Sequence, residues 1–275
     1  MFLTIINDSR DGNAFGRQQT RASALFGCGV ATVGVRDDLE ASGNLVDALD
    51  AGEGHEGVVL VNVAPRQTNG KKLGRGSVGF FGAEVAKKEN GSPFGYFYYD
   101  KTLVVGSVDG ITLSLVKKLG IADRINVLDI AAMGTALIEK GIISDDVARR
   151  MAATQFRSYE FLPRVAHWIA GGQPVVSVEQ SLDTPDAPKA VWWIDSFGNA
   201  KTTLLPEDVS FAEGKNAETL FGSLGCFTSL KDVPDEVAGL VIGSSGIGDK
   251  RFLEIVVQGE SASERFHLVS GSRVL

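Results

Sequence analysis

Cysteine and histidine are scarce in this chain of 275 residues. The two cysteines, Cys28 and Cys226, are far apart and form no C-x-x-C pair. We therefore expect two reduced thiols and no disulfide framework. No ligand spacing typical of a metal site connects the three histidines, which are His55, His167 and His267. The sequence accordingly predicts no metal cofactor.

Long apolar runs and an excess of basic charge are also missing. No stretch reaches the roughly 18 apolar residues of a membrane-spanning helix. The N-terminal "MFLTIINDSR" has no basic region, and its apolar run is too short for a signal peptide. Lys and Arg total 27 against 34 Asp and Glu, a formal net charge of −7, whereas a nucleic-acid surface needs a clustered basic face. We expect a cytoplasmic protein that binds neither membranes nor nucleic acids.

The first part of the chain alternates between strand and helix patterns. Apolar runs with high strand propensity occur in "FLTIIND", "GVATVGV" and "GVVLVNVAP", and helical spacing separates them in "FGRQQTRASALFG" and "DDLEASGNLVDAL". "YFYYDKTLVVGSVDG" predicts two strands that meet at an Asp100-Lys101 turn, and Ser144 is a plausible helix cap in "SDDVARRMAATQF". This alternation favours an α/β domain with a central mixed sheet over residues 1–175.

The last part of the chain has a different character. Residues 176–187 include one proline, with a second directly after them at Pro188, and several acidic side chains with little periodicity, which is typical of a linker. Beyond them, short strand-like segments follow one another with turns between: "VWWIDS", "AKTTLL", "GCFTSL", "AGLVIGSS", "FLEIVVQG" and "FHLVSGSRVL". The sequence therefore predicts a small all-β domain over residues 188–275.

Three polar segments are candidate ligand sites. Asp8 follows the first strand, where a carboxylate can bind a ribose diol or, equally well, cap the next helix. The loop "RQTNG", with Thr68, follows another strand and is either a ligand loop or a plain solvated one. The glycine-rich "GSSGIGDK", which contains Asp249, matches neither the dinucleotide fingerprint nor the P-loop. A long hairpin turn is its favoured interpretation, ahead of backbone approach to a ligand.

The segment "DSFGN" follows the strand "VWWI" and admits two interpretations. Gly198 and Asn199 are turn formers, so it is suited to close a hairpin. Asp195, Phe197 and Asn199 also place a carboxylate, an aromatic ring and an amide close together, as the edge of a ligand site does.

Segments along nearly the whole chain resemble, in order, the S-adenosylmethionine-dependent hydroxide adenosyltransferases and their relatives, the fluorinases and chlorinases. "IDSFGN" is similar to that family's I-D-x-F-G-N. "RFLEIVVQGESASERFHLVSGSRV" is similar to its closing segment, and "IINDSRDGNAFGRQQTRASAL" stands in the place of its aspartate-bearing first strand and helix. The resemblance implies an α/β N-terminal domain, a small barrel-like C-terminal domain and a homotrimer. It places the ligand between one subunit's N-terminal domain and its neighbour's C-terminal domain.

The same resemblance implies roles for individual residues. Asp8 would hold the ribose diol, and Asp195 would approach the methionine ammonium. Phe197 would stack on the adenine, and Asn199 would hydrogen-bond to its edge. Thr68 and Asp249 are further expected ligand contacts.

The family's Asp-Arg-His set is not retained. In "NVAPRQTNGKK", Ala64 stands in place of its aspartate and Lys71 in place of its arginine. The histidine should fall in "TQFRSYEFLP", which has none. This segment can be aligned with the family in two ways. One alignment makes Ser158 a candidate anion- or water-binding residue, and the other puts Phe156 at the histidine position. Neither alignment supplies a general base.

Two functional hypotheses follow. The first is an enzyme that transfers the 5′-adenosyl group of S-adenosylmethionine to water or a small anion and releases methionine. The second is a catalytically silent protein that binds S-adenosylmethionine or another adenosine compound, because the binding motif is present and the catalytic set is not. A pocket that serves an unrelated acidic ligand is a third, less favoured interpretation.

Overall fold

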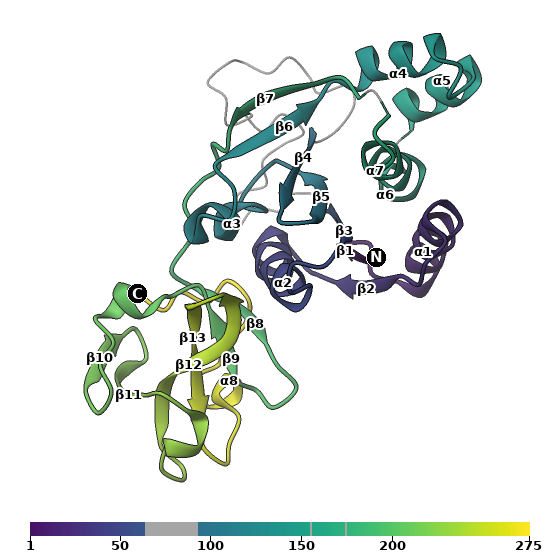
Figure 1. Cartoon of the computed structure of the whole chain (residues 1–275). Helices are drawn as coiled ribbons and strands as arrows, with labels where there is room; N and C mark the ends of the chain where they lie inside the picture. Colours follow the sequence, from purple (N-terminus) through teal and green to yellow (C-terminus); the bar gives the residue numbers. More distant parts are fainter. Residues whose placement is uncertain (64–92, 155, 174) are drawn as a thin grey trace. The chain divides into compact units, whose positions relative to one another are not determined.

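The protein has an α/β fold made of two mixed sheets with helices (Figure 1). The computed structural model describes residues 1–63, 93–154, 156–173 and 175–275. They form two compact units, Met1–Pro185 and Asp186–Leu275. No helix among the described residues is long and apolar enough to cross a membrane.

The N-terminal unit contains a seven-stranded sheet with the order β2-β1-β3-β5-β4-β6-β7. Four neighbouring strands are parallel: β2 (Ala31–Gly34), β1 (Phe2–Asn7), β3 (Gly57–Asn62) and β5 (Thr102–Ser107). The other three are antiparallel to their neighbours: β4 (Phe94–Tyr99), β6 (Arg124–Leu128) and β7 (Ser177–Ser181). All four strands of the parallel part end at one edge of the sheet, which is the edge where ligands of α/β proteins commonly bind.

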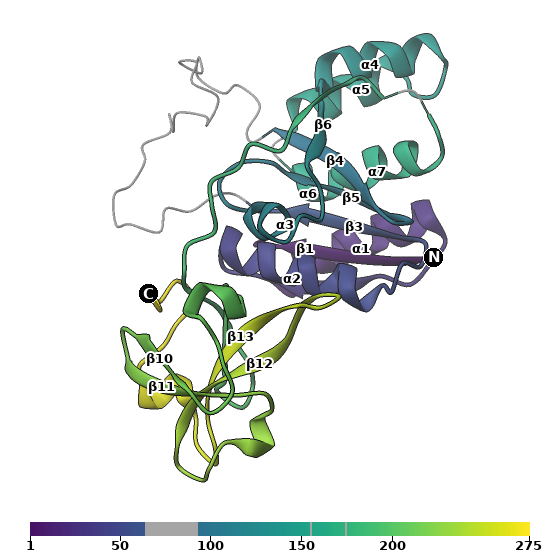
Figure 2. The same cartoon turned by 60° about the vertical axis from the view of Figure 1, so that its left-hand side comes forward.

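Helices cover both faces of this sheet (Figures 1 and 2). α1 (Gly12–Phe26) packs against α7 (Leu162–Ala170), and α7 lies on β3 and β5. α2 (Asp38–Ala51) lies on β1 and β3 and packs against α3 (Ser114–Leu119). The remaining helices of this unit are α4 (Ile130–Glu139), α5 (Asp145–Ala153) and α6 (Arg157–Glu160). Both faces of β3 are buried, which explains the unbroken apolar run "GVVLV" in the sequence.

Local signals in the sequence set several element boundaries. The helix cap expected at Ser144 is confirmed, since its hydroxyl accepts a hydrogen bond from Val147 N. The turn expected between β4 and β5 is confirmed as well. Asp100 takes a positive φ of 49° there, a conformation in which aspartate is enriched.

The C-terminal unit contains a six-stranded sheet with the order β10-β11-β12-β13-β9-β8. Only β11 and β12 are parallel, so this sheet is mixed as well. Its strands are β8 (Val191–Ile194), β9 (Ala200–Thr202), β10 (Asn216–Thr219), β11 (Gly222–Phe227), β12 (Ala238–Ile247) and β13 (Lys250–Val257). Two 3₁₀ helices, Pro206–Val209 and Leu230–Asp232, and the short helix α8 (Ala262–Arg265) complete it.

The end of the chain connects the two outer strands of this sheet. Val274 N donates to Lys189 O, just before β8, and Val274 O accepts from Leu220 N, just after β10. The expectation of a strand at "FHLVSGSRVL" was wrong, because this segment follows α8 as an irregular tail, whose one β-bridge joins Arg273 to Ala190.

The segment expected as a linker, 176–187, is only partly irregular. Residues 177–181 form β7, which pairs along its whole length with β6. Its polar sequence, SVEQS, gives no hydrophobic alternation, so the strand arises from backbone pairing at the sheet edge. The boundary between the two units falls a few residues later, after Pro185.

Candidate ligand-binding site

Polar side chains gather where the parallel strands of the N-terminal unit end. Asn7, Asn62 and Ser107 are the last residues of β1, β3 and β5. Asn62 Nδ2 donates to Asn7 Oδ1 at 3.0 Å, and Ser9 N donates to the same oxygen at 3.1 Å. Ser107 Oγ accepts from Val63 N at 3.2 Å. Ligands of α/β proteins bind at this edge of the sheet.

Asn7 is an unusual member of this group. Its side chain is fully buried, yet its Nδ2 atom has no hydrogen-bond acceptor among the described residues. Leaving a buried polar group unpaired costs about 1–3 kcal/mol, so such groups are rare. A ligand oxygen at the strand ends would supply the missing acceptor. Nothing in the sequence distinguished Asn7 beyond a polar residue closing an apolar strand.

Asp8 lies at the same edge and is half-buried. Its backbone N–H donates to Asn62 O at 3.3 Å. The cap of α1 is Asp11, whose Oδ1 accepts from the backbone N–H groups of Asn13 and Ala14 at 3.0 Å. The interpretation of Asp8 as the helix cap is therefore wrong, and its role as a ligand residue stays a prediction.

Arg157 brings a positive charge to this part of the sheet. Its guanidinium lies 4.3 Å from the centroid of the Phe94 ring and 5.4 Å from that of Phe161. Phe94 begins β4 and pairs with Ser107 at the end of β5, which places the guanidinium near the strand ends. Burial lowers the pKa of Arg157 to about 10, partly offset by the negative charge of Asp109, so the group stays protonated at neutral pH.

Ser158, the candidate anion- or water-binding residue, follows Arg157 in α6 and is half-buried. The role of Ser158 stays a prediction. The arginine that precedes it in "FRSYE" is the residue whose position over Phe94 only the structure reveals.

Asp38 fixes the loop that follows β5. Its carboxylate oxygen Oδ2 accepts from Ile111 N at 2.9 Å, and the side chain is 4% exposed. Burial raises the pKa of Asp38, and the Ile111 hydrogen bond opposes this shift only in part. Asp109 lies in the loop held by this contact. Asp38 is therefore a positioning residue, and no sequence pattern pointed to it.

In the C-terminal unit, "DSFGN" is the turn between β8 and β9. Asp195 Oδ1 accepts from the backbone N–H groups of Phe197 at 2.8 Å and Asn199 at 2.9 Å. Its Oδ2 accepts from Asn199 Nδ2 at 3.0 Å. One carboxylate thus holds the whole turn in shape. The expected turn is present, and the ligand contacts of Asp195 and Asn199 stay predictions.

Gly198 and Phe197 have distinct roles in this turn. Gly198 has a positive φ of 85°, and a Cβ atom there would collide with the hydroxyl of Ser261. Gly198 O accepts from Ser263 N at 2.8 Å, which fixes the turn against the start of α8. The Phe197 side chain is 78% exposed. A rigid turn that presents an aromatic ring to solvent offers a stacking surface for a flat ligand.

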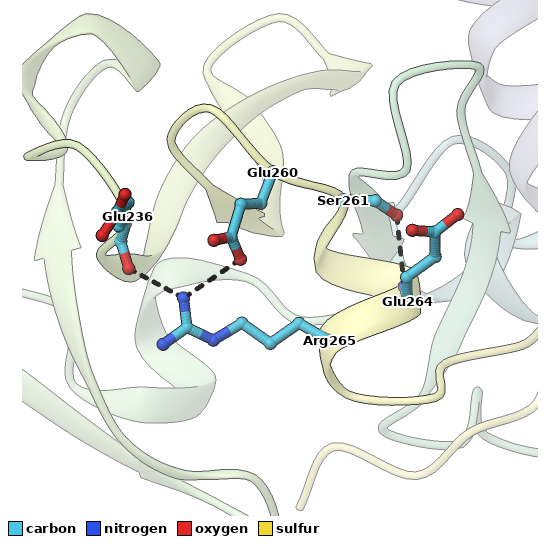
Figure 3. A pocket seen from close by; sticks show the side chains of 5 residues that line it. All are labelled: Glu236, Glu260, Ser261, Glu264 and Arg265. Atoms are coloured by element: carbon cyan, nitrogen blue, oxygen red, sulfur yellow. Dashed lines mark hydrogen bonds and ion pairs between the residues drawn. The ribbon is translucent and has the colours of Figure 1, made fainter.

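A hollow of about 550 Å³ adjoins this turn and shares Ser261 with it (Figure 3). Arg265 reaches across the hollow, and its Nη1 donates to Glu236 O at 2.7 Å and lies 3.5 Å from Glu260 Oε2. Ser261 Oγ accepts from Glu264 N at 3.1 Å. Three carboxylates against one guanidinium make the lining acidic, which favours ligands with positive charge.

The remaining positions predicted from the sequence lie outside the described residues or in an exposed turn. Thr68 lies outside the described residues, as do Ala64 and Lys71. Asp249 is exposed in the turn between β12 and β13. Only two residues, Gly248 and Asp249, separate Ile247 from its partner Lys250, so the long turn expected for "GSSGIGDK" was wrong. β12 continues through most of that segment with an irregularity between Ile242 and Gly246.

Among the described residues, no group of three or more His, Cys, Asp or Glu side chains is arranged to hold a metal ion. The described side chains at and near the strand ends offer carboxylates, amides, a hydroxyl and a guanidinium. The turn in the C-terminal unit offers an aromatic ring beside an acidic hollow.

Comparison with known proteins shows the fold but no family. No family model matches the chain, and no curated protein matches it. A structure of an uncharacterized conserved protein from Thermotoga maritima matches with 15% identity and a TM-score of 0.64, covering all of both chains. A conserved hypothetical protein from Thermus thermophilus matches with 19% identity and a TM-score of 0.53, covering all of this chain and 99% of the other. The whole chain thus shares its fold with these two proteins.

Proposed function

We propose that this protein binds S-adenosylmethionine and transfers its 5′-adenosyl group to water or a small anion, releasing methionine. The observation that carries the proposal is the "DSFGN" turn. Asp195 locks its shape by three hydrogen bonds, while Phe197 remains 78% exposed. Burying such a side chain under a ligand is worth about 1.5–3 kcal/mol.

The C-terminal unit supplies the contacts to the adenine and to the charged part of the ligand. The Phe197 ring stacks on the purine, and Asn199 addresses its hydrogen-bonding edge. S-adenosylmethionine carries a sulfonium and an ammonium, both positive. The acidic hollow beside Ser261 supports this assignment, because its carboxylates attract such charges. Asp249 is a further contact in this proposal.

The N-terminal unit supplies the contacts to the ribose and the nucleophile. Asp8 accepts the two hydroxyl groups of the ribose, and Asn7 donates to a ligand oxygen. Ser158, which follows Arg157 in α6, holds the incoming water or anion. Thr68 is a further contact. The position of Asn7 and Asp8 at the carboxyl end of β1 supports the assignment.

The proposed reaction is a substitution at the C5′ atom of the ribose. The nucleophile forms a bond to C5′, the C5′–sulfur bond breaks, and its electron pair stays on sulfur. The leaving group is neutral methionine, so no general acid is needed. When water is the nucleophile, its proton passes to solvent. The protein then acts mainly by orienting the nucleophile opposite sulfur and excluding other water.

We also propose a homotrimer in which the C-terminal unit of one subunit and the N-terminal unit of another bind one ligand. In the same proposal the C-terminal unit is barrel-like. The hydrogen bonds of Val274 to both Lys189 and Leu220 support this shape, because they connect the two outer strands of its sheet. The trimer is the assembly that the resemblance in sequence implies.

A silent binding protein is the second candidate. Ala64 replaces the aspartate of the family's catalytic set, and "TQFRSYEFLP" has no histidine. Loss of an acid–base group commonly lowers the rate by about 10²–10⁴-fold. Binding without turnover is the outcome that distinguishes this candidate.

Incubation with S-adenosylmethionine, with and without chloride, tests the proposal. Chromatography should detect methionine together with adenosine or a 5′-substituted adenosine. Calorimetry on the same samples should give binding that Phe197→Ala weakens about 5- to 100-fold, the value of one base–aromatic stack. Leu220→Ala is the matched control, an exposed apolar residue of the same unit that is 65% exposed. Binding without products supports the silent protein, and absence of binding contradicts both candidates.

A further inference from the structure

Three arginines from two helices surround one short helix in the N-terminal unit. α1 contributes Arg17 and Arg21, and α7 contributes Arg164. The short helix is α6, which presents Tyr159 and Glu160 to them. None of these five residues has a part in the proposed adenosyl transfer.

Tyr159 and Glu160 hold the arginines in place. The Arg17 guanidinium lies 3.9 Å from the centroid of the Tyr159 ring, and that of Arg21 lies 5.8 Å from it. Arg21 Nη1 and Arg164 Nη2 approach the same oxygen, Glu160 Oε1, at 3.8 and 3.9 Å. These distances exceed a hydrogen bond, so the carboxylate attracts both groups without occupying their donors.

Positive charge is in excess in this cluster. Among the described residues, Glu160 is the only carboxylate within ion-pair distance of Arg21 and Arg164, and Arg17 has none. Arg21 Nη1 and Arg164 Nε also lack hydrogen-bond acceptors there. Burial lowers the pKa of Arg164, and the charges of Arg21 and Arg150 lower it further against the opposing charge of Glu160.

Solvent reaches the cluster. Arg17 is exposed, and the side chains of Arg21 and Arg164 are 27% and 24% exposed. An anion can therefore reach this cluster from solvent, while the Tyr159 ring contacts Arg17 and Glu160 attracts Arg21 and Arg164. A guanidinium presents its N–H groups as a fixed planar fork that matches the oxygens of a phosphate.

We propose that Arg17, Arg21 and Arg164 form a binding site for a dianionic phosphate group. Three guanidinium groups against one carboxylate leave two positive charges, which a dianion balances. Arg21 Nη1 and Arg164 Nε are buried donors without acceptors among the described residues, and a shift of the two side chains toward the anion lets them bind its oxygens. This site is independent of the adenosyl-transfer proposal.

Calorimetric titration of the whole protein with inorganic phosphate tests the site. The background is chloride at the same ionic strength, so that unspecific screening is constant. We expect saturable binding that strengthens from about pH 5.5 to about pH 8, as phosphate loses its second proton. Arg17→Gln and Arg164→Gln should each weaken it at least about 5-fold, and Arg164→Lys should restore part of it.

Arg124→Gln is the matched control. Arg124 is an exposed arginine of β6 that pairs with Glu179 at 2.9 Å, so the same change of charge is made away from the cluster. Arg17→Gln keeps the test decisive if Arg164→Gln fails to fold, because Arg17 is exposed. Phenyl phosphate binding more tightly than phosphate assigns the site to phosphate esters, and equal binding assigns it to the free ion. Absence of binding above chloride, or equal losses in Arg124→Gln and Arg17→Gln, overturns the proposal.

Discussion

Asp195 shows how much a single side chain determines in this protein. Its two carboxylate oxygens accept three hydrogen bonds from Phe197 and Asn199, and the turn they hold carries the exposed ring. Its first role is therefore to shape the turn. A role toward a ligand ammonium uses the acceptor capacity that remains on the carboxylate.

Replacing Asp195 tests this role. Asp195→Ala removes all three hydrogen bonds and should lower the free energy of unfolding by about 1–3 kcal/mol. Asp195→Asn should cost less, because its Oδ1 still accepts from the backbone and only the contact with Asn199 Nδ2 is lost. Denaturant unfolding followed by tryptophan fluorescence measures both, since Trp192 and Trp193 precede the turn. Asp249→Ala, an exposed turn residue, is the control, and a loss as large as that of Asp195→Ala would contradict this role.

At the scale of elements, the start of α2 has a property that depends on pH. Asp38 lies in the first turn of this helix and is buried against the loop after β5. Burial raises the pKa of its carboxyl group above that of the unfolded chain. The folded state then binds the proton more tightly, so this group stabilises the protein at low pH. That contribution is lost as pH rises from the unfolded pKa through the folded one.

Asp38→Asn removes this titration. The amide oxygen can still accept from Ile111 N, so the loop contact is retained. As pH rises from about 4 to about 7, the wild type loses this contribution and the variant does not. We therefore expect the free energy of unfolding of the variant to increase relative to that of the wild type over this range. Unfolding by urea across this range measures the difference. Asp145→Asn makes the same change in the first turn of α5 at an exposed position, and a similar gain there would show that burial is not the cause.

The elements themselves were predictable to different degrees. Apolar runs identified β1, β2 and β3, and helical spacing identified α1 and α2. The edge strand β7 was not predicted, because its polar residues show no alternation of apolar and polar side chains and its structure comes from pairing with β6. β10 and α4 were not predicted from the sequence either. "FHLVSGSRVL" was mistaken for a strand because β-type composition does not report whether a partner strand is available.

At the scale of the whole molecule, the proposed trimer makes a direct prediction. Light scattering coupled to size-exclusion chromatography should give three times the chain mass of 29.2 kDa. The exposed apolar side chains of the C-terminal unit, which include Phe197, Ile242 and Val269, are consistent with a contact surface. A monomeric mass would contradict the trimer and with it a site shared between subunits.

The sequence by itself determined what a few neighbouring residues control. The "DSFGN" turn is of this kind, because Asp195 bonds to residues two and four positions away and the positive φ of Gly198 is a local requirement. The tertiary structure decided the rest. It placed Arg157 over the Phe94 ring, Asp38 against Ile111, and the arginines of α1 and α7 around Glu160. Burial and neighbouring charge govern these groups, and both depend on where distant segments of the chain meet.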